Sequence, residues 1–336
     1  MAGRPIGAAC TPSAFAKSQK RANFLYKENF RYFPARCAPL CGRCGTCRRM
    51  KGRSTASRQP LHKNGTDIRV EIPFAGMAFY HPEERPAAFR FLIEAQEADD
   101  SGALLWGSEE FAVPTFLYRR DSGAFDWLTR QSGGRPGMSF RINSDWDTFT
   151  LYQDHTGTKG ERAFRECGFL FSYAVLQHHA CVLHGVVMEY DGMGILVLAA
   201  AGTGKTTHTR MWRDRKNALI LNGDRCLCRK KDGVWYAYGM PWSGSSGEYI
   251  NRRVPISCIV NLNRGTENTV SRLPVFDGTL RLMQRIFAPM WPGVLQNRAF
   301  DCCEELAAEI PILDFYCKPE PQSVDTLERA IRRVCG

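Results

Sequence analysis

The side chains best placed to do chemistry lie in residues 199–207, which read Ala-Ala-Ala-Gly-Thr-Gly-Lys-Thr-Thr. The apolar run 195–198 precedes this segment, and a helix-compatible stretch over 205–213 follows it. A strand, a glycine loop, Gly-Lys-Thr and a helix in this order are the context that a phosphate-binding P-loop requires. Glycines let backbone N–H groups turn onto phosphate oxygens, and the N-terminus of the helix adds partial positive charge. The segment therefore predicts a nucleotide-binding site.

Two side chains of this segment have expected roles in that site. Lys205 can reach the β- and γ-phosphates, and the Thr206 hydroxyl can ligate Mg²⁺. The full pattern is not met, because Ala199 stands where it begins with glycine. A strand-to-helix turn that only happens to hold Gly-Lys-Thr is the alternative. The predicted nucleotide ligands are Gly202, Thr203, Gly204, Lys205, Thr206 and Thr207.

A carboxylate follows about twenty residues later in the sequence. The short apolar run 218–221 ends at Asn222-Gly223-Asp224-Arg225. An acid at the carboxyl end of a strand can lie beside the metal of a bound nucleotide. Thr206 and Asp224 are therefore the predicted metal ligands.

The charge of the chain is unevenly distributed. The net charge of its 336 residues is +11, but residues 1–66 hold 14 Lys and Arg against one acid, and the rest of the chain is close to neutral. A nucleic-acid role would therefore rest on residues 1–66 alone, and we do not predict one. No apolar run approaches the length of a membrane span, and no apolar region of a secretory signal follows the basic start. We expect a cytoplasmic protein that does not associate with membranes, in which most of the 14 cysteines are small buried side chains.

Residues 1–66 are predicted to be a separate segment. Its cysteines at 37, 41, 44 and 47 are spaced closely enough for zinc or an iron–sulfur cluster. The first three share the spacing of radical S-adenosylmethionine enzymes, but no long α/β barrel follows. A disordered tail, a translation start at Met50 or Met77, and a transit peptide are the other interpretations.

The remaining chain is predicted to form two parts, a small α+β subdomain over 67–158 and a nucleotide-binding domain over 159–336. In the first part we expect strands at 68–72, 111–117 and 148–152 and a helix at 85–97. In the second part, Asp191-Gly192 and Lys231-Asp232-Gly233 are typical hairpin turns. They predict strand pairs 182–190 with 194–198 and 227–229 with 234–238. The other expected elements are helices at 161–178 and 280–287, strands at 255–262 and 311–316, and a closing helix through 324–334 capped by Ser323.

Five motifs in order resemble the HPr kinase-like P-loop proteins, in the branch often found beside peptide-modification genes. They are Leu183-His184-Gly185, the hairpin that follows it, Ala201 to Thr209 with Trp212, Ile220 to Arg225, and Tyr238 to Gly244. The resemblance continues through Val254 to Val260, Glu267-Asn268 and Ile312 to Pro319. The resemblance covers 180–336 well, 67–180 loosely and 1–66 not at all. It implies an α/β fold with a mixed sheet, whose P-loop core is of the HPr kinase and phosphoenolpyruvate carboxykinase type.

The resemblance also implies an activity. The chain would be a serine kinase that moves the γ-phosphoryl group of ATP, with Mg²⁺, to a hydroxyl of a protein or peptide. Lys205 would act on the phosphates, Asp224 would bind metal or act as the base, and His184 would orient the acceptor. HPr kinases carry two adjacent acids at this place, whereas this chain has Gly223-Asp224. A scheme that needs separate metal and base carboxylates is therefore in doubt.

Further side chains around these motifs have open roles. The cations of Arg225, Arg252 and Arg253 are candidates for neutralising charge in the transition state. Trp242, Ser243 and Gly244 form either a lid or a plain surface loop, and His184 is either an active-site or a core histidine. His208 and Thr209, with Thr207, are expected to position the helix rather than to react.

Two other functions compete with the kinase. Ala199 and the single acid at 224 favour a nucleotide-binding but non-catalytic partner of a peptide-modifying assembly. A phosphoenolpyruvate carboxykinase would need a metal-binding Lys/His/Asp set and substrate-binding arginines that the sequence does not reveal. The acceptor, the choice between ATP and GTP, the reversibility of the reaction and a homo-oligomeric state are left open.

Overall fold

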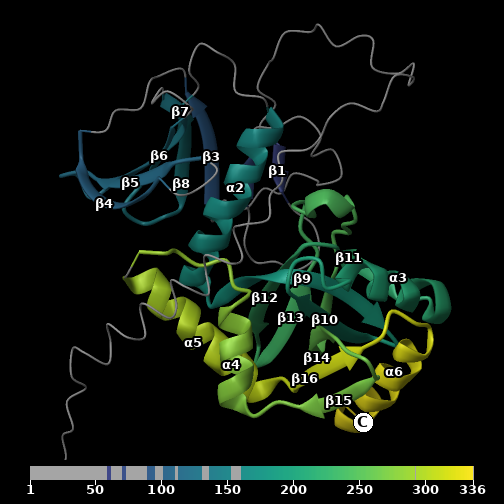
Figure 1. Cartoon of the computed structure of the whole chain (residues 1–336). Helices are drawn as coiled ribbons and strands as arrows, with labels where there is room; N and C mark the ends of the chain where they lie inside the picture. The colour runs from purple at the N-terminus through teal and green to yellow at the C-terminus, as the bar shows by residue number, and fades with distance from the viewer. Residues whose placement is uncertain are drawn as a thin grey trace, which may run out of the picture. The chain divides into compact units, whose positions relative to one another are not determined.

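The computed structural model describes residues 59–61, 70–72, 89–94, 101–109, 113–130, 136–152, 160–291 and 293–335, and Figure 1 gives their elements. All of them belong to one compact unit, Cys47–Gly336. Within these ranges, no helix is both long and apolar enough to cross a membrane. The expectations for Cys37 to Cys47 fall outside the described residues.

A first sheet precedes the glycine loop in sequence and contains eight strands in the order β1-β2-β3-β8-β7-β6-β5-β4. The pairs β2–β3 and β3–β8 are parallel, and the other neighbours are antiparallel. The strands are β1 (Gln59–Leu61), β2 (Val70–Ile72), β3 (Phe89–Glu94), β4 (Ala103–Ser108), β5 (Thr115–Arg119), β6 (Phe125–Arg130), β7 (Pro136–Ile142) and β8 (Thr148–Tyr152).

The helix expected at 85–97 is wrong, because this stretch contains strand β3. Phe89 and Phe91 are buried while Arg90 and Leu92 are exposed, which is the two-residue period of a strand. The residues on either side of β3 favour a helix by their local propensity, but parallel pairing with β8 makes this stretch a strand. The described part of 67–158 therefore consists of strands and turns.

The second sheet is mixed and carries the glycine loop. Its order is β10-β9-β12-β13-β14-β16-β15, with β11 on β9, and β10 also pairs with β14 so that five strands close into a ring. The pairs β10–β14 and β14–β16 are parallel. The strands are β9 (Ala180–Tyr190), β10 (Met193–Ala199), β11 (Leu219–Asn222), β12 (Arg225–Lys231), β13 (Val234–Tyr238), β14 (Arg253–Arg264), β15 (Thr269–Arg272) and β16 (Ile312–Cys317). Mixed α/β architecture is thus confirmed.

Both predicted hairpins are present. Asp191 and Gly192 have φ values of 50° and 75°, and Asp232 and Gly233 have 51° and 78°. Positive φ at both central residues gives the turn whose twist matches that of the flanking strands.

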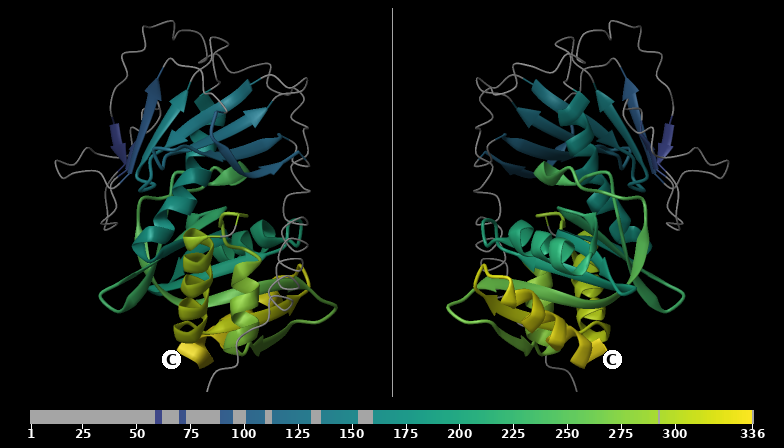
Figure 2. Two further views of the ribbon diagram at one scale, coloured as in Figure 1. Left: turned by 90° about the vertical axis from the view of Figure 1, so that its left-hand side faces the viewer. Right: turned by 90° about the vertical axis from the view of Figure 1, so that its right-hand side faces the viewer.

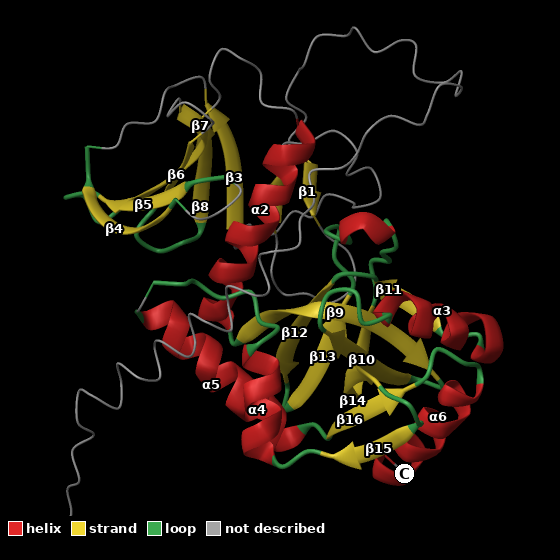
Figure 3. Ribbon diagram, in the orientation of Figure 1, coloured by secondary structure: helices red, strands yellow, loops and turns green. Residues whose placement is uncertain are grey.

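The helices are α2 (Gly160–Ala174), η1 (Val175–His178), α3 (Lys205–Lys216), η2 (Gly244–Ser246), α4 (Val275–Met283), α5 (Val294–Glu309) and α6 (Gln322–Cys335) (Figure 3). The helix expected at 280–287 begins earlier and ends at Met283, and α5 was not predicted. Ser323 does not cap α6: it lies inside the helix, and its hydroxyl donates to the Glu320 carbonyl at 2.6 Å.

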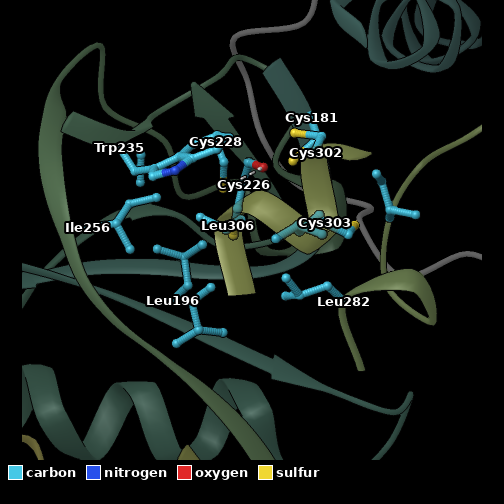
Figure 4. Close-up of a cluster of buried hydrophobic side chains, with 14 of the residues drawn as sticks. Cys181, Leu196, Cys226, Cys228, Trp235, Ile256, Leu282, Cys302, Cys303 and Leu306 are labelled. Atoms are coloured by element: carbon cyan, nitrogen blue, oxygen red, sulfur yellow. Dashed lines mark hydrogen bonds between the residues drawn. The ribbon is translucent and has the colours of Figure 1, made fainter. Parts of the chain in front are cut away.

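Three buried clusters hold these layers together. One cluster joins strands of the first sheet to α2 and reaches Trp242. A second joins the second sheet to α4 and α5, and a third joins that sheet to α3 and α6. Figure 2 shows from two sides how the helices lie beside the strands. Figure 4 shows the second cluster, in which cysteines pack among Leu, Ile and Trp side chains. Of the nine cysteines in the described part, all are free thiols and seven are buried, as predicted for small apolar side chains.

Candidate active site

The glycine loop is open and ends at an uncapped helix. Gly202 and Gly204 have φ values of 74° and 107°, which other residues rarely adopt. A side chain at either glycine would meet nothing within 4 Å. Helix α3 begins at Lys205 without a side-chain cap, and its first backbone N–H groups have no carbonyl to bond within the helix. The loop therefore presents free donors and positive helix charge, which suit a phosphate group.

The three predicted catalytic side chains meet beside this loop. Lys205 Nζ lies 3.1 Å from His184 Nε2, and His184 Nδ1 lies 3.5 Å from Asp224 Oδ1. His184 on β9 is paired in register with Arg225, the first residue of β12, so the strand pairing itself brings Asp224 to His184. A backbone bond from the Gly185 N–H to the Asp224 carbonyl at 2.9 Å fixes this approach. The chain of contacts Lys205–His184–Asp224 is the centre of the candidate site.

The protonation states of Lys205, His184 and Asp224 are consistent with one another. Burial, followed by the cations of Lys205, Arg285 and Arg225, lowers the pKa of His184 to about 3, so its ring is neutral at physiological pH. A neutral ring can accept a hydrogen bond from the Lys205 ammonium at Nε2 and donate from Nδ1 toward Asp224. Burial also raises the pKa of the Asp224 carboxyl, against the opposing effect of Arg225 and Lys205, and lowers the pKa of Lys205.

Arg225 is held beside Asp224 by two aromatic rings. Its guanidinium lies 4.5 Å from the Phe169 ring centre and 4.8 Å from that of Phe287, and its Nε is 3.8 Å from Asp224 Oδ2. The side chain is buried, and burial lowers its pKa to about 10, which leaves it charged. A Cβ at Gly168 would lie 2.5 Å from Arg225 Nη1 and 2.7 Å from Trp242 Cδ1, so glycine there leaves room for both side chains.

The loop after β13 is anchored rather than free. Trp242 is buried, stacks on Phe164, and donates from Nε1 to the Phe164 carbonyl at 2.8 Å. Ser243 is also buried, whereas Gly244 is exposed and lies against the Asp224 carboxylate. A Cβ at Gly244 would be 2.6 Å from Asp224 Cγ. The loop thus encloses the Asp224 carboxylate on one side.

Ser246 occupies the place where a second acid would project. A Cβ at Gly223 would lie only 2.1 Å from Ser246 Oγ. The Ser246 hydroxyl donates to the Ser243 carbonyl at 2.7 Å and accepts from the Glu248 N–H at 3.2 Å. With the loop in this position, a side chain at residue 223 would clash with Ser246, which gives a steric reason for glycine rather than a second acid there.

The other side chains proposed from the sequence make contacts away from Asp224. Arg252 pairs with Glu189 at 2.6 Å, and Arg253 lies over the Tyr236 ring, so neither of the two is placed with Asp224 by these contacts. His208 is buried; its Nε2 accepts from Trp212 Nε1 at 3.2 Å, and Thr209 donates to the Lys205 carbonyl, as expected of positioning residues.

Two residues near the site were not predicted from the sequence. Asn222 is fully buried; its Nδ2 donates to the Met240 and Trp242 carbonyls, and its Oδ1 accepts from the backbone N–H groups of Asp224 and Arg225. Arg285 follows α4, its carbonyl accepts from the His184 N–H at 2.7 Å, and its charge acts on both His184 and Lys205. Asn222 could have been found from its place beside Asp224 at a strand end, whereas Arg285 has no local signal.

The oxygen donors fit Mg²⁺ better than a transition metal. Thr206 is exposed on the first turn of α3, and Asp224 is partly exposed. In the part of the chain that the structure describes, no three His, Cys, Asp or Glu side chains cluster to hold a metal by themselves. Mg²⁺ at nucleotide sites is usually held by one or two protein oxygens together with phosphates and water, and Thr206 and Asp224 offer oxygens of this kind.

Comparison with known proteins adds little. No family model and no curated protein matches the chain. Among solved structures it is similar to the Hpr(Ser) kinase/phosphatase from Coxiella burnetii, with 12% identity over 45% of this chain and 90% of that chain and a TM-score of 0.29. A likeness this weak carries no inference about the site or the activity.

Proposed function

We propose that this protein is a Mg²⁺- and ATP-dependent kinase that transfers the γ-phosphoryl group to a serine or similar hydroxyl of a protein or peptide. The observation that carries the proposal is the chain of contacts Lys205–His184–Asp224 beside an open glycine loop. The ordered motifs of the HPr kinase-like proteins support it from the sequence.

The nucleotide would bind where the backbone offers donors. Gly202, Thr203 and Gly204 would wrap the β- and γ-phosphates, with the N–H groups of Lys205, Thr206 and Thr207 behind them. The Arg264 guanidinium donates to the Gly202 carbonyl and so ties this loop to β14. When bound, Mg²⁺ would supply positive charge to the phosphate oxygens, held by Thr206 and Asp224.

Asp224 is the proposed base. The acceptor hydroxyl gives its proton to the Asp224 carboxylate while its oxygen bonds to the γ-phosphorus, and the bond from that phosphorus to the β–γ bridging oxygen breaks to release ADP. A raised pKa makes the carboxylate a better proton acceptor in this step. Lys205 and Arg225 stabilise the charge that spreads over the phosphoryl oxygens. His184, as a neutral bridge, holds Lys205 and Asp224 at their spacing.

A second candidate function is nucleotide binding without transfer, in a partner of a peptide-modifying assembly. The observation in its favour is that Ser246 fills the space of a second acid, which leaves one carboxylate to serve both metal and acceptor.

Label transfer from γ-labelled ATP with Mg²⁺ in extract of the source cells tests the proposal. Lys205→Ala should abolish transfer with little change in the folded state, while Arg210→Ala, an exposed cation on the same helix, should leave it intact. Asp224→Asn should reduce transfer about 10²-fold or more and nucleotide binding much less. Unchanged transfer in Lys205→Ala refutes the P-loop assignment. Equal losses of transfer and of nucleotide binding in Asp224→Asn indicate that this carboxylate only binds the metal. Nucleotide binding without transfer by the wild type supports the second candidate function.

A further inference from the structure

Two cysteines far apart in the sequence meet at the end of the last helix. Cys258 is buried on β14, in the cluster that joins the second sheet to α3 and α6. Cys335, the last residue of α6, is exposed, and its Sγ lies 3.4 Å from the carbonyl oxygen of Ser257, the neighbour of Cys258. Cys258 shares that cluster with Ile331 and Val334 of α6, the turn that ends at Cys335, and each thiol shifts the pKa of the other. The pair thus combines one accessible sulfur with one buried cysteine on the strand that this turn packs against.

This combination distinguishes the pair from the other close thiols. Cys181, Cys228 and Cys302 also lie in one cluster, but all three are buried (Figure 4). An oxidant from solvent cannot reach any of these three sulfurs, so none of them can take the first step of an oxidation.

The contact also favours the reactive form of the exposed sulfur. Hydrogen bonding from the Cys258 thiol lowers the pKa of Cys335 to about 7, while the same bond and burial raise the pKa of Cys258. Near neutral pH a large share of Cys335 is therefore thiolate, the form that attacks oxidants.

We propose that Cys335 and Cys258 form a reversible disulfide when the protein meets a peroxide. The Cys335 thiolate attacks one peroxide oxygen, the O–O bond breaks, and Cys335 becomes a sulfenic acid as hydroxide leaves. Cys258 then gives up its proton and attacks that sulfur, the S–O bond breaks, and water leaves. The two thiols are oxidised by two electrons and the peroxide is reduced by two. A small dithiol reverses the reaction by exchange.

The local structure allows the sulfurs to close up. Disulfide formation needs the two sulfurs to approach to covalent distance, and the terminal turn of a helix frays easily enough to permit it. The bond would fasten α6 to β14, the strand that pairs with the glycine-loop strand through Cys258 and Ile195. Helix α6 in turn holds α3, because Lys216 pairs with Glu328 at 2.7 Å and Asp325 at 2.9 Å. Oxidation should therefore stabilise the framework of the glycine loop, whether or not the protein is a kinase.

Full-length protein, reduced and then treated with a small excess of hydrogen peroxide, tests the proposal. After free thiols are blocked, peptide mapping without reductant should find one peptide joined through Cys258 and Cys335, and dithiothreitol should remove the link. The same oxidation should raise the urea midpoint of unfolding, because a cross-link closing a long loop restricts the unfolded chain. Cys317→Ser is the matched control, since this half-buried cysteine is outside the pair and its loss should change neither result.

The Cys258→Ser variant separates the two steps. It should lose the linked peptide and accumulate sulfenic acid at Cys335, trapped by dimedone, and Cys335→Ser should lose both. If Cys335 in the wild type goes to sulfinic acid or to intermolecular dimers without the internal link, the proposal is overturned. A link that forms equally in Cys317→Ser but leaves the urea midpoint unchanged overturns the stabilising role of the bond.

Discussion

Replacing Asn222 by alanine tests whether one buried amide holds Asp224 and the loop after β13 together. The Asn222 side chain makes four hydrogen bonds to backbone groups, at 2.7 and 3.3 Å from Nδ2 and at 2.9 and 2.7 Å to Oδ1. Two of them fix the backbone of Asp224 and Arg225, and two fix the loop that lies against the Asp224 carboxylate. The amide is completely buried, so water cannot readily replace it.

The expected loss can be worked from these contacts. A hydrogen bond contributes about 1 kcal/mol net, and a buried group left unpaired costs more, so Asn222→Ala should lower the free energy of unfolding by about 3 to 4 kcal/mol. For a domain of this size, this corresponds to a fall in melting temperature of about 6 to 16 °C. If Asp224 is the base, a displacement of its carboxylate by about 1 Å should also reduce phosphoryl transfer about 10²-fold.

Urea unfolding of the variant, with label transfer measured below the transition, is the assay. Asn297→Ala, at an exposed position on α5, is the control and should change the free energy of unfolding by less than about 0.5 kcal/mol. Asn222→Asp keeps the acceptor for Asp224 and Arg225 but turns a carboxylate toward two carbonyl oxygens, so it should be at least as destabilising as alanine. A loss below about 1 kcal/mol in Asn222→Ala would refute the argument.

Two further predictions follow from the site and its supports. The methyl group of Gly223→Ala should clash with Ser246 and lower the free energy of unfolding by about 1 to 3 kcal/mol. The double variant with Ser246→Gly should regain most of this stability. If the losses of the two single variants simply add in urea unfolding, the steric explanation is contradicted. Burial lowers the pKa of His208 to about 4, below its unfolded value, so the unfolded state binds more protons between about pH 6.5 and 4. The free energy of unfolding should therefore fall by about 2 kcal/mol between pH 7 and pH 5. His208→Gln should remove this pH dependence, as measured by urea unfolding at the two pH values.

Local patterns predicted the elements whose signals lie in a few adjacent residues. The Asp191-Gly192 turn marks a hairpin because it readily adopts two positive φ angles, and the glycines before Lys205 mark a loop for the same reason. The strand at 148–152 and the spacing of apolar residues in α6 were likewise visible. Each of these features is decided within one turn or one strand.

Elements stabilised by distant partners were predicted poorly. Strand β3 lies among helix-forming residues and owes its conformation to β8, more than fifty residues later. Ser323 has the side chain of a helix cap, yet the turn before α6 places it inside the helix, where its hydroxyl donates to Glu320.

The candidate site also combines features visible in the sequence with features that depend on tertiary structure. The sequence by itself determined the glycine loop, Lys205 and the single carboxylate at 224, because each lies in a run of neighbouring residues whose pattern is typical of a phosphate-binding loop or of the strand end beside it. Only the tertiary structure decided that His184 bridges Lys205 and Asp224, that Arg285 joins them, and that Ser246 fills the space at Gly223. These contacts depend on the register of β9 against β12 and on the path of the loop after β13. Register and loop path are set by the packing of the whole sheet, which no short stretch of sequence records.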